Sequence, residues 1–315
     1  MADYDLAIIG SGPAGLTSAI YAGRALVKTL VLAGKVPGGQ LMLTSGVENY
    51  PGFSNAVQGP DLMQEMRKQA ERFGAEIVDE DVESVNFKSK PFQLVAGGNT
   101  HTAKAVIIAT GSSAKWLGLT SEKRLLGRGV SSCATCDGFF FRERRVVVVG
   151  GGDTALEEAL FLTKYATQIT VVHRRDQLRA SKILQKRAMA NGKIVFLWNS
   201  VVEEILGLEK VEGVKIRNVK TSESSMIPSD GIFVAIGYTP NTTVFEGQIQ
   251  LDEKGYIVSK HGTQTNVEGV FVAGDVHDYK YRQAVTAAGE GCKAAVDALA
   301  YLEEQKEIEV AAKEN

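Results

Sequence analysis

Two cysteines at short spacing are the residues of this chain best placed to do chemistry. Cys133 and Cys136 form a C-x-x-C pair, and Asp137 follows them directly. Two thiols this close can cycle between a dithiol and a disulfide. Inert buried thiols and a zinc half-site are the alternatives. Tetrahedral zinc needs four ligands, but the sequence holds no second C-x-x-C and its four histidines are scattered. The pattern therefore favours a redox-active pair.

The residue after this pair favours proton transfer beside it. As a general acid, Asp137 could protonate the thiolate released when the disulfide opens, or its charge could hold back thiolate formation. A plain turn residue is the alternative, because Asp-Gly is a strong turn signal. The third cysteine, Cys292, lies among small residues of a predicted helix. We expect Cys292 to be a buried small hydrophobe without chemistry.

A glycine-rich turn near the N-terminus predicts a first dinucleotide site. An apolar strand over 4–10 leads into G-x-G-x-x-G, a helix pattern runs from Leu16 to Arg24, and a second strand covers 28–33. Glycines there let the backbone approach a pyrophosphate, which sits on the N–H groups at the helix start. The second strand ends in Ala33-Gly34-Lys35, without the usual acid for a ribose hydroxyl, so that contact is unassigned. The fingerprint residues are Gly10, Ser11, Gly12, Pro13, Ala14 and Gly15.

The same unit recurs in the middle of the chain. A strand over 144–150 leads into a G-x-G-x-x-A variant, a helix pattern from Thr154 to about Tyr165, and a strand over 168–173. This second strand ends in a basic cluster where an acid would favour NAD. Guanidinium forks suit a 2′-phosphate, so the cluster predicts NADPH; a solvated basic surface is the alternative. The predicted contacts are Gly150, Gly152, Asp153, Thr154, His173, Arg174, Arg175 and Arg179.

Two dinucleotide units predict an α/β fold with two Rossmann-like domains. Because the basic cluster marks the NADPH unit, the N-terminal unit is the better candidate for FAD. A late apolar strand over 269–274 ends in Gly-Asp. Its Asp275 can accept a hydrogen bond from a flavin ribityl hydroxyl, with a helix N-cap as the alternative. We expect the second unit to be inserted into the first: 1–113 and 240–315 would bind FAD, and 114–239 would bind NADPH and carry the disulfide.

Composition excludes several other classes of protein. The 315 residues carry a formal net charge of −2 with both signs interspersed, which predicts neither nucleic-acid nor acidic-membrane binding. No apolar run approaches the roughly 20 residues that a membrane helix needs. The acidic start is unlike a secretory signal, and three cysteines cannot form a disulfide framework. We expect a cytoplasmic protein.

The chain resembles the low-molecular-weight NADPH-dependent thioredoxin reductases over nearly its whole length. Each matching motif is modest alone, but all follow in the family's order. Besides the two fingerprints and the Cys133–Gly138 segment, they are Gly38–Gln40, Glu48–Gly52, Ala109–Gly111, His173–Asp176, Gly274–Val276 and Tyr281–Ala284.

The resemblance implies that electrons pass from NADPH through FAD and the Cys133–Cys136 disulfide to oxidised thioredoxin or a thioredoxin-like protein. It makes Asp137 the acid/base, Phe139 and Phe140 the apolar pair that helps to hold the protein substrate, and the enzyme a homodimer. The stretch Lys35–Pro37 departs from the acid-bearing segment often seen in the family. The implied FAD contacts are Gly39, Gln40, Asn49, Thr110, Gly111, Gly274, Asp275, Arg282, Gln283 and Ala284.

Two kinds of alternative function remain. Dithiol oxidases and ferredoxin-driven relatives share FAD and C-x-x-C, but are not expected to keep both the second fingerprint and the basic cluster. A relative resembling ferredoxin–NADP reductase would lack the cysteine pair. A nucleotide-binding redox sensor, from another class, would be reduced once and stop.

Overall fold

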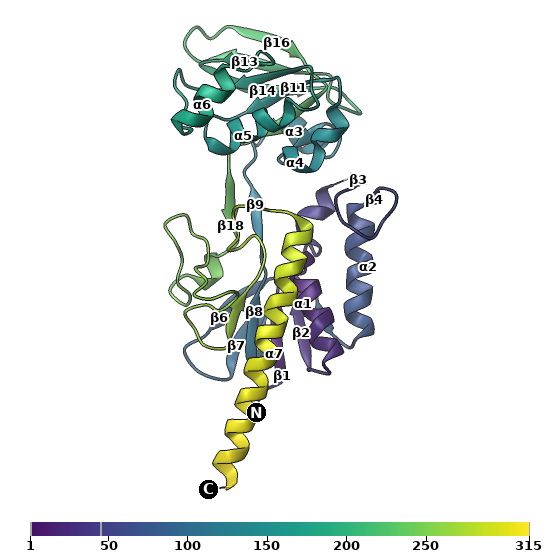
Figure 1. The fold of residues 1–315 in the computed structure, drawn as a ribbon, viewed down its shortest axis with the longest axis vertical. Coiled ribbons are helices and arrows are strands. Elements are labelled where there is room, and N and C mark those ends of the chain that lie inside the picture. Colours follow the sequence, from purple (N-terminus) through teal and green to yellow (C-terminus); the bar gives the residue numbers. More distant parts are fainter. Residues whose placement is uncertain (1, 45, 315) are drawn as a thin grey trace. The chain divides into compact units, whose positions relative to one another are not determined.

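The computed structural model describes residues 2–44 and 46–314 (Figure 1). The chain divides into two compact units: unit 1 is Met1–Ser113 with Thr239–Asn315, and unit 2 is Ala114–Tyr238. The sequence placed the second boundary one residue later, at 239/240. Strand β9 (Ser112–Ala114) lies at the first crossing between the units, and β18 (Tyr238–Pro240) lies at the second.

Unit 1 is built on a seven-stranded sheet in the order β5-β2-β1-β8-β7-β6, with β19 also paired to β8. Strands β5, β2, β1, β8 and β19 run parallel, and β7 and β6 add an antiparallel edge. Parallel strands end at one edge of the sheet, so the loops that follow them gather there. The bounds are β1 (Tyr4–Ile9), β2 (Thr29–Leu32), β5 (Glu76–Val78), β6 (Val82–Asn86), β7 (Phe92–Ala96), β8 (Asn99–Ile108) and β19 (Val270–Val272).

Both faces of this sheet are buried. Successive residues of β1 point to opposite faces, so Leu6 and Ile8 enter one apolar cluster while Ala7 and Ile9 enter another. Helices cover the first cluster, and the short η3 contributes Phe245 to the second. The remaining elements of unit 1 are α1 (Pro13–Arg24), η1 (Gly39–Leu43), β3 (Gly46–Val47), β4 (Val57–Gln58), α2 (Gly59–Arg72), η3 (Thr243–Phe245) and α7 (Ala284–Glu314).

Small residues bring α1 and α7 close together. The Ser18 hydroxyl on α1 donates to the Gly291 carbonyl on α7 over 2.9 Å. A Cβ atom added at Gly291 would collide with the Ala14 carbonyl oxygen, so only glycine permits this approach. The first turn of α1 is thereby held against α7.

Unit 2 repeats the plan on a smaller scale. Its parallel sheet has the order β10-β17-β11-β12-β13, and a separate antiparallel sheet has the order β14-β15-β16. The strands of the parallel sheet are β10 (Val130–Ser131), β11 (Arg145–Val149), β12 (Gln168–Val172), β13 (Ile194–Leu197) and β17 (Gly231–Val234). The other elements are α3 (Thr120–Leu125), α4 (Ala134–Asp137), η2 (Gly138–Phe141), α5 (Asp153–Leu162), α6 (Lys182–Met189), β14 (Ser200–Leu206), β15 (Gly213–Asn218) and β16 (Ser224–Pro228).

The C-terminal segment is helical through its charged end. Helix α7 packs on the core as far as Leu302, and most described side chains beyond that residue are exposed. Across residues 2–44 and 46–314, no helix has the length and apolarity that a membrane crossing requires.

Candidate active site

The first fingerprint forms a turn that only glycine permits. Gly10 has φ +109°, and a Cβ atom there would collide with the Ala109 carbonyl oxygen. A Cβ atom at Gly15 would collide with the Gly10 carbonyl oxygen. Gly12 is the N-cap of α1, no side chain caps this helix, and the space above Gly12 is open. The N–H groups of the first helical turn therefore face outward, as an anion site requires.

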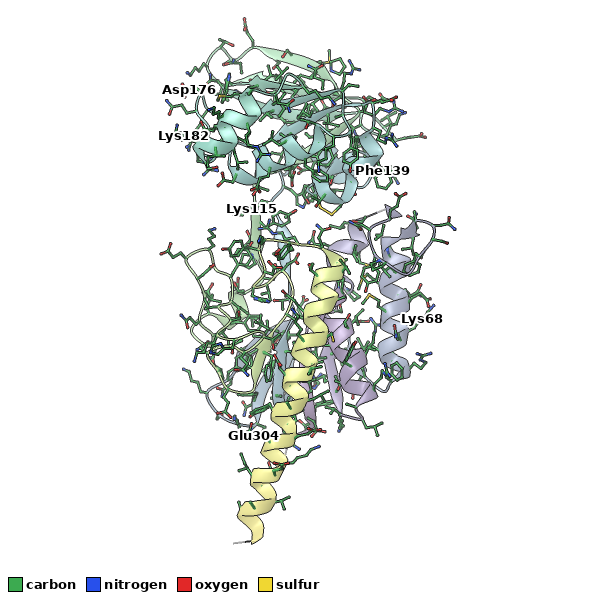
Figure 2. The ribbon with its side chains drawn as sticks, viewed as in Figure 1. Lys68, Lys115, Phe139, Asp176, Lys182 and Glu304 are labelled. Atoms are coloured by element: carbon green, nitrogen blue, oxygen red, sulfur yellow. A yellow bond between two sulfur atoms is a disulfide. The ribbon has the colours of Figure 1, made fainter. Side chains whose placement is uncertain are left out.

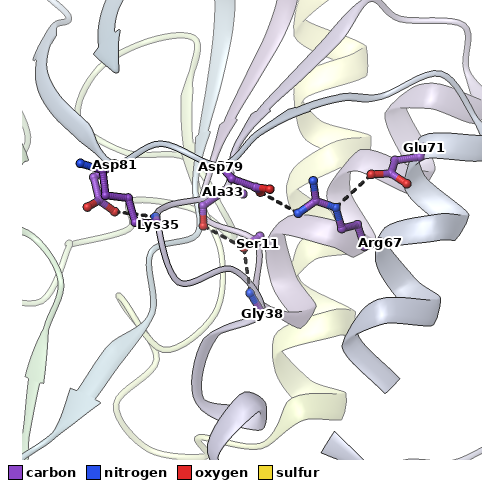
Figure 3. Close-up of polar contacts among 8 residues, drawn as sticks. All are labelled: Ser11, Ala33, Lys35, Gly38, Arg67, Glu71, Asp79 and Asp81. Atoms are coloured by element: carbon purple, nitrogen blue, oxygen red, sulfur yellow. Dashed lines mark hydrogen bonds and ion pairs between the residues drawn. The ribbon is translucent and has the colours of Figure 1, made fainter. Parts of the chain in front are cut away.

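Ser11 ties the next loop onto this turn (Figure 3). Its hydroxyl donates to the Ala33 carbonyl over 2.9 Å and accepts a hydrogen bond from the Gly38 amide over 3.0 Å. Gly38 has φ +101°, and a Cβ atom at Gly39 would lie 3.6 Å from the Gly12 Cα. The loop that begins η1, with Gln40, is thus held beside the fingerprint, with Pro13 and Ala14 opening α1.

Other predicted FAD contacts of unit 1 lie beside this turn or beside one another. A Cβ atom at Gly10 would lie 3.1 Å from the Thr110 Cα, and one at Gly274 would lie 3.0 Å from the Ala14 Cβ. The Asn49 amide donates to Gln283 over 3.4 Å. Gly111 follows Thr110, and Arg282 and Ala284 flank Gln283. The fold gathers all of these predicted residues in unit 1; contact of each with a cofactor stays a prediction.

Asp275 is a half-buried carboxyl just past the end of β19. Burial raises the pKa of Asp275 to about 7, although the positive charge of Arg282 acts in the opposite direction. The nearest following helix, α7, begins only at Ala284, so the N-cap alternative for Asp275 is wrong. Its hydrogen bond with a flavin ribityl hydroxyl stays a prediction.

Glu290 and His277 fix the backbone beside Asp275, and the sequence analysis missed both. One carboxylate oxygen of Glu290 accepts a hydrogen bond from the Gly274 amide over 2.7 Å and meets the His277 Nε2 at 2.9 Å. Burial acts to raise the pKa of Glu290, but the hydrogen bond from His277 and its charge outweigh burial and lower it. The sequence does contain one indication of Glu290: it is the single acid in the run Ala287–Gly291, which otherwise holds only small residues.

The second fingerprint repeats these features in unit 2. Gly150 has φ +154°, and a Cβ atom there would collide with the Ala235 carbonyl oxygen. Gly152 is the N-cap of α5, without a side-chain cap and with open space above it. Asp153 accepts a hydrogen bond from the Ser181 amide over 2.7 Å, and Thr154 follows in the first turn. This helix start also suits a phosphate group.

The segment that carries the basic cluster, residues 173–179, is called the basic loop below. Its backbone is hydrogen-bonded to the second fingerprint. The Arg179 amide donates to the Gly151 carbonyl over 2.7 Å. His173 is only 5% exposed; its ring packs against Gly151 and its Nε2 meets the Gln177 carbonyl at 3.0 Å. The imidazole therefore shapes the loop from inside.

Three guanidinium groups remain on the outside of the loop. Arg174, Arg175 and Arg179 are all exposed. Of the acids nearby, Asp176 is paired with Lys220 at 2.9 Å. The exposed arginines can meet an anion, and their contact with a 2′-phosphate stays a prediction.

Cys133 and Cys136 are joined in a disulfide (Figure 2), with Cα atoms 5.3 Å apart. Cys133 is the N-cap of α4, and its sulfur accepts a hydrogen bond from the Cys136 amide over 3.2 Å. The Cys133 amide in turn donates to the Ser131 hydroxyl over 3.0 Å. Because each sulfur is bonded to the other, the pair is neither two inert thiols nor two zinc thiolates. A sulfur at a helix N-terminus is favoured as a thiolate once the bond opens.

A half-buried carboxyl group and two aromatic rings follow the disulfide along the chain. Burial raises the pKa of Asp137, and a hydrogen bond with Ser131 offsets this in part. Asp137 is the last residue of α4, and its side chain makes no helix-capping hydrogen bond. Phe139 and Phe140 follow, 50% and 47% exposed, with their rings edge to face.

Cys292 differs from its expected burial. Its side chain is partly exposed on α7. A hydrogen bond with Cys292 raises the pKa of Tyr21, which lies on α1. The small residues of α7 pack against α1, and Cys292 lies at the solvent-exposed edge of this helix pair.

Comparison with known proteins gives the family. A family profile described as pyridine nucleotide-disulphide oxidoreductase matches residues 4–291. A thioredoxin reductase of Rickettsia conorii is 55% identical over 300 residues, covering 94% of this chain and 97% of its own. The chain belongs to the thioredoxin reductase family of pyridine nucleotide-disulphide oxidoreductases.

Other thioredoxin reductases support the same assignment. The one from Streptomyces coelicolor is 55% identical over 298 residues, covering 94% of this chain and 92% of its own. The solved structure of the one from Giardia duodenalis has a TM-score of 0.91 and 44% identity, covering 96% of this chain and 100% of that one. The resemblance, the α/β fold with two Rossmann-like units and the oxidoreductase class are thereby confirmed. Thioredoxin reductases of this family use FAD and NADPH, and Cys133–Cys136 is the redox-active disulfide.

Proposed function

We propose that this chain passes electrons from NADPH, through FAD, to its own disulfide and then to oxidised thioredoxin or a thioredoxin-like protein. The observation that carries the proposal is the Cys133–Cys136 disulfide at the start of α4. The same chain has two glycine-rich turns that lead into helices without side-chain caps, α1 and α5. FAD, when bound, supplies a carrier that accepts two electrons from a nicotinamide and delivers them to a disulfide.

Unit 1 is proposed as the FAD-binding domain. The uncapped N-terminus of α1 and the open space over Gly12 fit a pyrophosphate. Asp275 fits a ribityl hydroxyl, because a buried carboxyl gains most from a hydrogen-bonding partner. The bonds from Glu290 to Gly274 and His277 hold the backbone beside Asp275 in place. The neighbouring segments around Gln40, Asn49, Thr110 and Gln283 would enclose the rest of the cofactor.

Unit 2 is proposed as the NADPH-binding domain that also carries the disulfide. The fingerprint lies at the N-terminal end of α5, where Gly152 caps the helix. The C-x-x-C segment packs against the other end, since a Cβ atom at Gly138 would lie 3.3 Å from Leu162. The ten residues of α5 span about 15 Å at 1.5 Å per residue. This separation supports a carrier between nucleotide and disulfide.

Asp137 is proposed to manage the proton of the opened disulfide. Two electrons break the S–S bond and leave two sulfurs, which take up protons to become thiols. A carboxyl with a raised pKa, one residue from Cys136, can hold a proton for the released thiolate. The dithiol then attacks the partner's disulfide as a thiolate, forms a mixed disulfide and returns to the oxidised state as the partner is reduced.

The protein partner is proposed to dock beside the disulfide. Phe139 and Phe140 are half-exposed aromatic rings two and three residues past Asp137. Exposed aromatic side chains supply much of the binding free energy at protein interfaces. We also propose a homodimer, as the family resemblance implies, and a cytoplasmic location, because a disulfide that must be re-reduced in every cycle suits a reducing compartment.

The test is an anaerobic titration of the purified full-length protein with NADPH, followed by addition of a thioredoxin and a chromogenic disulfide. We expect flavin bleaching and sustained thiol production, with thiol production lost in Cys133→Ser and in Cys136→Ser. Bleaching followed by a single turnover would favour a redox sensor instead. Absence of bleaching by NADPH would show that the basic loop has another role.

A further inference from the structure

The end of β2 has a feature that the first fingerprint leaves unexplained. In a dinucleotide-binding fold, the residue past the second strand usually carries an acid that binds the adenosine ribose. Here Ala33, Gly34 and Lys35 fill that stretch. Gly34 has φ +82°, where a side chain would be strained. The chain therefore cannot place an acid on Gly34 without cost.

A carboxylate from a distant segment, that of Asp81, lies beside this stretch (Figure 3). A Cβ atom added at Gly34 would lie 3.2 Å from the Asp81 Oδ1, so this carboxylate lies beside the point where a side chain of residue 34 would begin. The Asp81 Oδ1 accepts a hydrogen bond from the Lys35 amide over 3.0 Å. The backbone of β2 and β5 continues this pairing, since the Ala33 amide donates to the Val78 carbonyl over 2.8 Å.

The neighbouring acids are engaged by cations, and Asp81 is not. Asp79 forms an ion pair with Arg67 at 2.6 Å, and Arg67 also meets Glu71 at 2.9 Å (Figure 3). Glu80 lies 3.7 Å from the Lys35 ammonium group. Among residues 2–44 and 46–314, Asp81 forms no ion pair, and its Oδ2 accepts no hydrogen bond. Asp81 is therefore the exposed acceptor at the tip of β2.

We infer that Asp81 takes over the role of the missing strand-end acid and accepts a hydrogen bond from the 2′-hydroxyl of the adenosine ribose of FAD. The inference rests on the proposed assignment of FAD to unit 1. The Lys35 amide fixes the Oδ1 atom, which leaves Oδ2 for the ribose. A ribose bearing a 2′-phosphate would bring a second negative charge to this carboxylate, so the site selects an unphosphorylated adenosine.

The experiment measures flavin release from the full-length holoenzyme, followed by the rise of free-flavin fluorescence after dilution. The test variant is Asp81→Asn, which keeps an oxygen for the Lys35 amide and removes the charge. The control is Glu83→Gln, an exposed acid on β6 that loses the same charge. We expect release about tenfold faster in Asp81→Asn, because charged hydrogen bonds are among the strongest that a site can make. Glu83→Gln should release flavin at the wild-type rate.

A second cofactor identifies the hydroxyl group concerned. In holoenzyme loaded with FAD that lacks the adenosine 2′-hydroxyl, wild type should release flavin about tenfold faster than with FAD. Asp81→Asn should add little to that change, as in a double-mutant cycle. Equal release of FAD from wild type and Asp81→Asn would overturn the inference, and so would equal acceleration in Glu83→Gln. A wild-type chain that binds no flavin would overturn the proposed function as well, so the two failures are distinguishable.

Discussion

Gly291 on α7 lies directly against the carbonyl oxygen of Ala14, in the first turn of α1. The contact joins residues at opposite ends of the chain. The Ser18 hydroxyl, one turn further along α1, donates to the Gly291 carbonyl over 2.9 Å. The start of α1 is the expected pyrophosphate site, so this crossing fixes the position of that site against the C-terminal helix.

Gly291→Ala should therefore destabilise unit 1. The added methyl group collides with backbone rather than with a flexible side chain, and overpacking of this kind costs about 1–3 kcal/mol. The measurement is urea unfolding followed by circular dichroism. Gly289→Ala is the matched control on the same helix: nothing lies within 4 Å of its added Cβ atom. The control should gain about 0.5–1 kcal/mol, as alanine does over glycine in a helix. Equal stability of the two variants would contradict the packing argument.

Asp137→Asn should slow the reduction of the protein partner without slowing flavin bleaching by NADPH. Loss of a general acid typically costs about 10²–10⁴-fold in rate. Burial raises the pKa of Asp137, so the wild-type carboxyl keeps its proton to higher pH than an exposed Asp, and turnover should fall as pH rises through that pKa. The variant should lack this fall.

The measurement for this variant is the pH profile of kcat with thioredoxin as acceptor. Glu209→Gln is the control, since this acid of unit 2 is exposed and lies outside both the basic cluster and the disulfide segment. A pH profile of Asp137→Asn that keeps the wild-type shape would assign the titration to another group.

Arg174→Ala and Arg175→Ala should each raise the KM for NADPH by about tenfold or more, because charged hydrogen bonds contribute about 1.5–3 kcal/mol. The KM for NADH should change little, since NADH lacks the 2′-phosphate. Steady-state kinetics with the two nucleotides give the ratio directly. Arg187→Ala on α6 removes the same charge from an exposed position outside the loop. An equal rise for NADH would indicate damage to the fold rather than loss of phosphate recognition.

Asp275→Asn should stabilise the flavin-free chain at alkaline pH. Burial raises the pKa of Asp275 to about 7 from an ordinary value of 3.8. Between these two values the folded state holds a proton that the unfolded state has lost, so wild-type stability falls as pH rises through this window. Asparagine carries no charge and escapes this loss.

Thermal unfolding of the flavin-free chain at pH 4 and pH 8 tests the prediction for Asp275. The difference in Tm between variant and wild type should be larger at pH 8. The exposed Glu253→Gln serves as control and should show little difference. A constant difference at both pH values would mean that Asp275 is ionised in the folded state throughout.

The sequence by itself determined the features that depend on local backbone chemistry. Gly10 and Gly150 have positive φ angles, and a Cβ atom at Gly15 would collide with the Gly10 carbonyl oxygen, so these glycines of the motif are required by the backbone of the turn itself. Buried parallel strands appear as continuous apolar runs, which gave both Rossmann-like units and the position of the cysteine pair before the second one.

Only the tertiary structure decided which distant side chains meet. Asp81 reaches Gly34 across 47 residues because β5 pairs with β2, and no local pattern encodes that register. Glu290 binds the Gly274 amide only because α7 packs across the end of β19. The burial of His173 and the partial exposure of Cys292 likewise depend on what packs against them. Local propensity acts over a few residues, whereas these contacts arise from long-range packing, which the order of residues alone does not display.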